Sequence, residues 1–75
     1  MKEWLKIFKK LPIGYQRLVA QAIEDILRGQ LTHLDIDDMG DGRMRCRIGK
    51  YRIIFRRTAT GYEVLKLGAR GDIYK

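Results

Sequence analysis

The stretch from residue 43 to residue 57, RMRCRIGKYRIIFRR, constrains the fold more than any other part of this 75-residue chain. Arginines alternate with apolar residues in its first half, and the two-residue side-chain period of a strand would place the two kinds on opposite faces. Gly49-Lys50 interrupts the alternation where a tight turn fits, and β-branched and aromatic residues follow it. The stretch therefore predicts a β-hairpin with one guanidinium face and one core face.

The alternation assigns each hairpin residue to a face. The polar face is predicted to hold five arginines and one isoleucine: Arg43, Arg45, Arg47, Arg52, Arg56 and Ile54. The opposite face is predicted to hold Met44, Cys46, Ile48, Tyr51, Ile53 and Phe55. A solvated hairpin seldom needs so many arginines in fixed rows, so the polar face is predicted to bind something.

Charge is distributed unevenly along the chain. Residues 1–41 hold six Lys and Arg against seven Asp and Glu, whereas residues 42–75 hold ten against two. The net charge of +7 therefore belongs to the second part, which carries the strands. Such concentration favours a surface that binds a polyanion, with phosphate as the expected anion.

Length and composition indicate one domain over residues 1–75, with a core that supplies a stability of only roughly 3 to 5 kcal/mol. Cys46 is the single cysteine, so an intramolecular disulfide is excluded, and its apolar neighbours predict a buried, reduced thiol. No apolar run reaches membrane-spanning length, and charges interrupt the N-terminus where a signal peptide is apolar. The expectation is a cytoplasmic protein with no membrane partner.

Before the hairpin, apolar residues recur at helical spacing in two segments, residues 2–11 and about 13–28, separated by Pro12. In the second segment a single apolar stripe is predicted from Leu18, Val19, Ala22, Ile23, Ile26 and Leu27. Gly29 stands where a C-terminal cap belongs. The two segments predict an antiparallel helix hairpin whose apolar seam covers the sheet.

The remaining segments complete the predicted fold. Residues 31–42 are predicted to form an exposed acidic loop whose carboxylates pair with nearby arginines, and His33 there has no second ligand for a metal site. Residues 62–70 predict a third strand, in which Val64 and Lys66 share a face. The fold class is therefore α+β, with the helix hairpin packed on one face of a three-strand antiparallel sheet.

This layout resembles the RelE/ParE toxin superfamily of toxin–antitoxin systems, and the chain looks like a RelE-type member. The specific segments are RMRCRIGKYRIIF at 43–55 and VLKLGARGDIY at 64–74, and the likeness extends over essentially the whole chain. The resemblance implies a RelE-like domain without the family's usual first strand. It also implies a metal-independent endoribonuclease that cleaves messenger RNA in the ribosomal A site.

The resemblance also assigns site residues. The implied catalytic residues are Arg43, Arg45, Arg52, Arg70 and Tyr74. The basic side chains expected to bind RNA are Arg47, Lys50, Arg56, Lys66 and Lys75. No metal or other cofactor is expected, and the implied partners are a cognate antitoxin protein, messenger RNA and the ribosome.

The chemistry of RNA cleavage can be set against these residues. Attack by a 2′-hydroxyl on the adjacent phosphate needs a proton acceptor, stabilisation of negative charge and a proton donor for the leaving oxygen. Guanidinium groups bind phosphate oxygens bidentately, but they are poor proton acceptors. Arginine stands at 43 and 45, where the family has lysine, so the base stays open between Lys50, Lys75 and Tyr74, or charge stabilisation acts alone.

Two other functions fit parts of the sequence. A ParE-like inhibitor of DNA gyrase would share the fold, although such members generally lack the arginine and tyrosine found here at 70 and 74. A non-catalytic basic nucleic-acid-binding module would fit the presence of arginine at positions 43 and 45, where the family has lysine. The leading hypothesis is a toxin that inhibits translation by ribosome-dependent cleavage of messenger RNA and is neutralised by its antitoxin.

Overall fold

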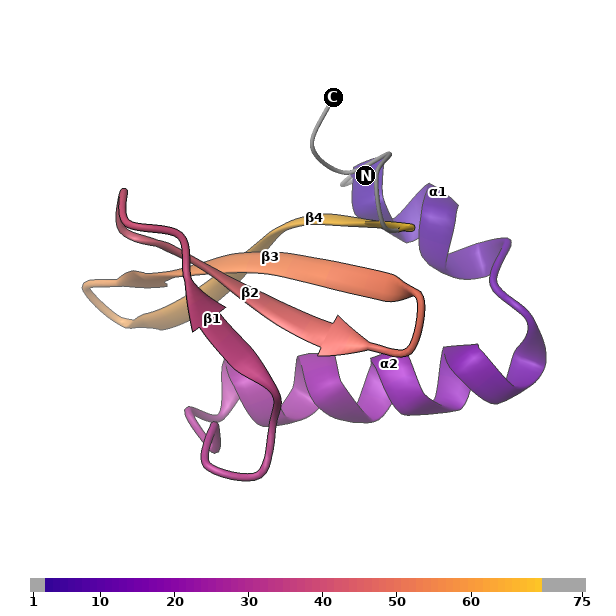
Figure 1. Cartoon of the computed structure of the whole chain (residues 1–75), viewed down its shortest axis with the longest axis horizontal. Coiled ribbons are helices and arrows are strands. Elements are labelled where there is room, and N and C mark those ends of the chain that lie inside the picture. Colours follow the sequence, from indigo (N-terminus) through magenta and orange to yellow (C-terminus); the bar gives the residue numbers. More distant parts are fainter. Residues whose placement is uncertain (1–2, 70–75) are drawn as a thin grey trace.

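The computed structural model describes residues 3–69, which form two helices and four strands (Figure 1). Helix α1 spans Glu3–Lys9 and helix α2 spans Ile13–Leu27. Pro12 ends the first helical pattern and directly precedes α2, as its fixed φ allows. The predicted pair of helices is confirmed.

Both ends of α2 are held by hydrogen bonds from neighbouring segments. At its start, the Gln16 side chain donates to the carbonyls of Phe8 and Lys9, at 3.3 and 3.1 Å, and so ties α2 to the end of α1. At its end, Gly29 has a φ of 75°, in the left-handed region that favours glycine. Its N–H donates to the Ile26 carbonyl at 3.0 Å, so the predicted glycine cap is confirmed.

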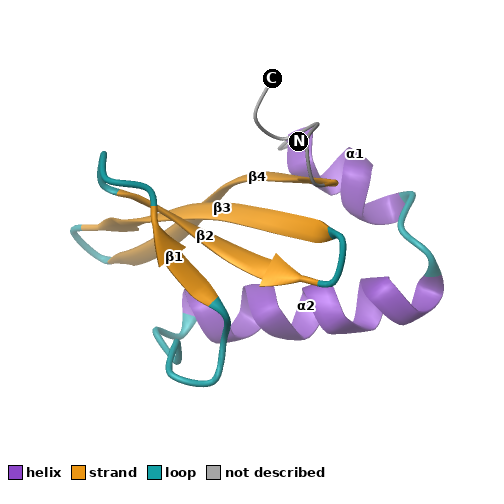
Figure 2. Ribbon diagram, viewed as in Figure 1, coloured by secondary structure: helices purple, strands orange, loops and turns teal. Residues whose placement is uncertain are grey.

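The sheet has four antiparallel strands in the order β1-β2-β3-β4 (Figure 2). The strands span Ile36–Asp38 (β1), Arg43–Ile48 (β2), Tyr51–Thr58 (β3) and Gly61–Ala69 (β4). The α+β class is confirmed, but the predicted count of three strands is wrong.

The additional strand, β1, lies within residues 31–42, so the prediction that this whole segment is a loop is wrong. Its sequence, Ile-Asp-Asp, has a low intrinsic preference for strands, because aspartate is depleted in sheets. Pairing with β2 supplies what local propensity does not: Ile36 lies opposite Cys46 and Asp37 lies opposite Arg45. Backbone hydrogen bonds from Met39 to Arg43 and from Arg47 to Asp35 extend the ladder at both ends.

The predicted faces of the β2–β3 hairpin are confirmed. Cys46 lies opposite Ile53, and Met44 lies opposite Phe55, so these side chains share one face. Cys46, Ile53 and Phe55 are fully buried on that face. Val19 and Ile26 of α2 belong to the same core cluster, and α2 runs along this side of the sheet (Figure 1).

A register shift in β4 changes the predicted faces of that strand. Ile54 pairs with Lys66 but Phe55 pairs with Val64, which leaves Leu65 as an extra residue in β4. Val64 therefore points into the core and is 5% exposed. The prediction that Val64 shares a face with Lys66 is wrong, because simple alternation does not anticipate a bulge.

The buried stripe of α2 is narrower than predicted. Leu18 and Leu27 are 58% and 53% exposed, so their predicted place in the stripe is wrong. Asp25 is 6% exposed and occupies part of the buried side instead. A helical stripe that faces a small sheet needs only positions three or four apart, and Val19, Ala22 and Ile26 supply them.

Within residues 3–69, neither helix has the length and apolar character required to cross a lipid bilayer.

Candidate functional site

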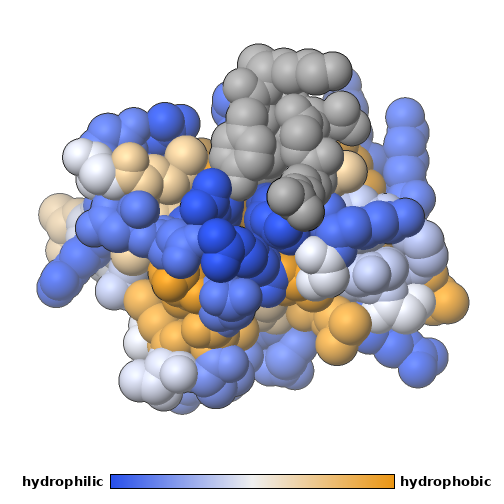
Figure 3. All heavy atoms as spheres, in the orientation of Figure 1, coloured by the Kyte–Doolittle hydropathy of each residue, from blue (hydrophilic) through white to orange (hydrophobic). Residues whose placement is uncertain are grey.

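The sheet face turned away from α2 carries a group of basic side chains, called the arginine face below. By strand register it holds Arg43, Arg45, Arg47, Arg52, Arg56 and Lys66. Two pairs of like charges lie directly opposite each other across the hairpin, which is destabilising unless anions or solvent compensate. In the space-filling view, hydrophilic side chains gather over the sheet, with apolar surface visible below them (Figure 3).

The arginine face has an apolar centre. Ile54 lies between Arg45 of β2 and Lys66 of β4 in the register of the sheet, and it is 1% exposed. Long basic side chains can cover apolar surface with their methylene stems while their charged ends stay in solvent. The methylene stems of the neighbouring basic side chains can therefore cover Ile54.

Two arginines of the face converge on one carboxylate. Arg45 Nη2 lies 2.9 Å from Asp37 Oδ2, and Arg47 Nη2 contacts the same oxygen. Arg47 Nη1 lies 3.7 Å from Asp35 Oδ1 as well. The hydrogen bond from Arg45 is the main cause that lowers the pKa of Asp37, and partial burial opposes it.

The outer arginines of the face also have acidic partners. Arg43 Nη2 lies 2.7 Å from Asp41 Oδ2, and hydrogen bonds from Arg43 lower the pKa of the Asp41 carboxyl. The same contact raises the pKa of Arg43 above its ordinary value. Arg56 Nε lies 2.5 Å from Glu63 Oε1. The prediction that carboxylates of the acidic segment pair with nearby arginines is confirmed.

Arg52 is held differently from the other arginines of the face. Its Nη1 donates to the carbonyl of Gly49 at 2.7 Å and to that of Tyr51 at 2.9 Å, and the residue is 9% exposed. These bonds close the turn between β2 and β3. Lys50 is exposed in that turn, with Nζ 5.6 Å from the centroid of the Tyr51 ring.

The structure therefore brings together the predicted basic residues of the three longest strands, while Lys50 lies at the end of the hairpin. Arg70, Tyr74 and Lys75 lie outside the described residues, so their predicted roles stay predictions. The sequence did not single out Asp37. A signal was present, because Asp35 and Asp37 repeat the two-residue spacing of Arg45 and Arg47.

His33 lies away from the arginine face and contacts α2. Its Nε2 is 2.8 Å from Asp25 Oδ2, and Gln21 Nε2 donates to the other carboxylate oxygen at 3.1 Å. The hydrogen bond with His33 is the main cause that lowers the pKa of Asp25. Residues 3–69 contain no group of three or more His, Cys, Asp or Glu side chains placed to hold a metal ion.

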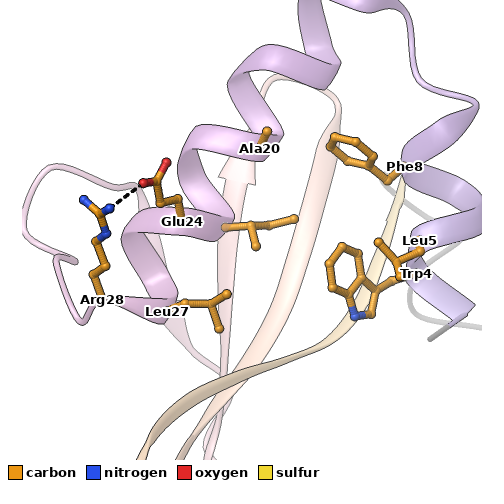
Figure 4. A pocket seen from close by; sticks show the side chains of 8 residues that line it. Trp4, Leu5, Phe8, Ala20, Glu24, Leu27 and Arg28 are labelled. Atoms are coloured by element: carbon orange, nitrogen blue, oxygen red, sulfur yellow. Dashed lines mark ion pairs between the residues drawn. The ribbon is translucent and has the colours of Figure 1, made fainter. Parts of the chain in front are cut away.

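An apolar groove of about 410 Å³ lies between the two helices (Figure 4). Trp4 and Phe8 of α1 face Leu27 and Ala20 of α2 across it. The Glu24–Arg28 ion pair, at 2.8 Å, lies at its rim. Its lining is apolar, so the groove suits an apolar side chain rather than a charged substrate.

Comparison with known proteins supports the fold. No family model and no curated protein sequence matches the chain. Among solved structures, a chain of the RelB–RelE antitoxin–toxin complex from Methanococcus jannaschii matches with a TM-score of 0.76 and 23% sequence identity. The match covers 99% of this chain and 92% of that chain, which shows that this chain has a RelE-like fold.

Proposed function

We propose that this chain is the toxin of a toxin–antitoxin pair and acts on RNA through its arginine face. The observation that carries the proposal is the position of this face on a RelE-like fold. Its guanidinium groups come from two adjacent strands, β2 and β3, and Lys66 of β4 lies beside them, so an extended nucleic-acid strand can contact several basic groups. The likeness to a chain of an antitoxin–toxin complex, over 99% of the length, supports the same reading.

The finer proposal is a ribosome-dependent endoribonuclease that cleaves messenger RNA. Arg43, Arg45 and Arg47 would bind the phosphates that flank the cut and stabilise negative charge in the transition state. Arg70 and Tyr74, carried over from the family, would act at the leaving oxygen and on an unpaired base. Lys50 is the candidate proton acceptor that lies within the described residues.

The geometry refines the predicted role of Arg52. Its Nη1 already donates two short hydrogen bonds to backbone carbonyls of the turn. A guanidinium group held in this way keeps its charge but has fewer free donors for a phosphate. We propose that Arg52 supports the reaction by fixing the hairpin and by its charge, while the arginines of β2 make the direct contacts.

A translating extract tests the proposal. Purified protein is added, and protein synthesis and message integrity are followed, with primer extension to locate cuts within codons. We expect arrest of synthesis together with cleavage at ribosome-bound codons. Intact message in the presence of folded protein would contradict the nuclease, and inhibition of DNA supercoiling by gyrase would point to the ParE-like alternative instead.

Two matched variants assign the activity to the arginine face. Arg45→Gln removes one charge from its centre, and we expect cleavage to fall by about tenfold or more, since a phosphate contact is lost. Arg57→Gln removes the same charge from an exposed position at the end of β3, opposite Tyr62 and off the arginine face. Equal loss in both variants would indicate a general effect of net charge.

The proposed partner is an antitoxin that covers the arginine face. Because the face is strongly basic, an acidic segment is the expected complement. Coexpression with a candidate antitoxin should abolish the arrest of translation, and the complex should migrate as one species on size exclusion. If Arg45→Gln binds that antitoxin as tightly as the unchanged chain does, the arginine face is not the main contact.

A further inference from the structure

The contact of Arg45 and Arg47 with Asp37 has the geometry of an anion site. Two guanidinium groups from alternate positions of β2 reach the same carboxylate oxygen. Arginine forms such converging, charge-assisted hydrogen bonds with carboxylates and phosphates alike, because both present oxygen atoms at similar separations. The place that Asp37 Oδ2 occupies is therefore a place that a phosphate oxygen can take.

The position of β1 makes this contact local to the chain. Asp37 lies directly opposite Arg45 in the register, so the carboxylate is delivered by backbone pairing rather than by a flexible tail. Asp35 adds a second carboxylate near Arg47. The strand is only three residues long and lies at the edge of the sheet, so few contacts hold these carboxylates in place.

We propose that Asp37, assisted by Asp35, is an internal competitor for the phosphate site formed by Arg45 and Arg47. In the free protein the carboxylate occupies this site and neutralises part of its charge. An RNA phosphate binds there by displacing the carboxylate, so affinity reflects the exchange of one anion for another. The inference rests on the proposed binding of RNA by the arginine face.

Two consequences follow for binding. Polyanions that offer several phosphates at once can displace the carboxylates, whereas a single phosphate group competes against an anion that is covalently part of the protein. The carboxylates also lower the charge of the free arginine face, so its attraction for nucleic acid at a distance is weaker than its six basic residues would suggest. The face therefore selects for ligands that contact several arginines together.

The test uses two isosteric variants that change net charge equally. Asp37→Asn removes the competing charge and keeps an oxygen that accepts from Arg45. Asp38→Asn is the control, since Asp38 is exposed, lies on the other side of β1 and bonds to the Gly40 N–H at 2.7 Å through an oxygen that asparagine retains. Binding of a fluorescent single-stranded RNA oligonucleotide is measured by anisotropy at several salt concentrations, after urea melts have confirmed folding.

We expect Asp37→Asn to bind this oligonucleotide about three- to tenfold more tightly than the unchanged chain. The slope of log affinity against log salt should steepen by up to about one, because an additional positive charge becomes available to a phosphate. Asp38→Asn should stay within about twofold of the unchanged chain. If the unchanged chain shows no measurable binding, measurable binding by Asp37→Asn and not by Asp38→Asn would support the proposal equally.

Two results would overturn it, and they differ in what else they overturn. If the unchanged chain binds RNA and Asp37→Asn binds no more tightly than Asp38→Asn, the carboxylate is not a competitor, while RNA binding by the arginine face stands. If neither the unchanged chain nor either variant binds RNA, both this inference and the proposed function fail.

Discussion

The two faces of the β2–β3 hairpin share one backbone but are stabilised by different means. On the core face, Cys46, Ile53 and Phe55 are fully buried against the helices. On the arginine face, charges of one sign are set beside aspartate and glutamate side chains of the same chain. Exposed ion pairs contribute little stability. Most of the stability therefore resides on the core face, which leaves the ion pairs of the arginine face free to exchange partners.

Truncation of the core face is the strongest test of this contrast. Phe55→Ala should lower the free energy of unfolding by about 3 to 5 kcal/mol, through lost burial and a residual cavity. That is comparable to the whole stability expected of a domain of this size, so the variant should be largely unfolded by circular dichroism. Arg57→Ala, two residues along the same strand and exposed, should unfold in urea like the unchanged chain. A Phe55→Ala variant with an unchanged urea midpoint would show that stability does not depend on the core face.

The chemistry of Cys46 tests how well the core face is sealed. Burial raises the pKa of its thiol to about 11, and the charge of Asp35 adds to the effect. The reactive thiolate is therefore scarce at pH 8, and labelling by a disulfide reagent should be at least roughly 100-fold slower than for an exposed cysteine. Full labelling in urea is the control. Rapid labelling of the folded chain would show that the core face opens readily.

Arg52 differs from the other residues of the arginine face, because its guanidinium group bonds to backbone carbonyls. Arg52→Ala should lower the free energy of unfolding by about 1.5 to 3 kcal/mol, because the carbonyls of Gly49 and Tyr51 lose their hydrogen bonds from a charged donor. Arg45→Gln, on the same face, should change it by about 1 kcal/mol or less, because its ion pair with Asp37 is partly exposed. Urea melts of the two variants measure the difference. Equal losses of stability would show that the backbone bonds of Arg52 contribute no more than the ion pair of Arg45.

A substitution in the turn between β2 and β3 should have a smaller effect on stability. Gly49 has a φ of 56°, and an added Cβ would lie 2.5 Å from Tyr15 Oη of α2. Gly49→Ala should therefore cost about 1 to 2 kcal/mol of unfolding free energy. Gly14→Ala is the matched control, because that helical position has open space around it and alanine favours helix by up to about 1 kcal/mol. Thermal melts of the pair should shift in opposite directions.

Much of the fold could be predicted from periodicity. The two helices, the turn between them and the faces of β2 and β3 followed from apolar spacing, because those segments bury one side along their whole length. The strand β1 did not, since three residues with two aspartates carry no local strand signal and pair only through β2. The predicted burial of Leu18 was wrong because spacing alone does not fix the width of a buried stripe.

The candidate site could be predicted in part. Alternation placed Arg43, Arg45 and Arg47 on one face, and the excess of aspartate nearby indicated acidic partners. Periodicity could not show that Asp37 is shared by two arginines, or that Arg52 turns its guanidinium to the carbonyls of its own turn. Those contacts depend on the register between strands, which is set by pairing over a distance in the chain.

The extra residue of β4 has a consequence for how the chain tolerates changes in length. Removal of any paired strand residue would turn the side chains beyond it to the wrong face of the sheet. Leu65 is the exception within β4, because the ladder is offset by one residue there and its deletion would restore continuous pairing from Lys66 to Val64. Homologous sequences that are one residue shorter at this position would therefore keep both faces of the sheet intact.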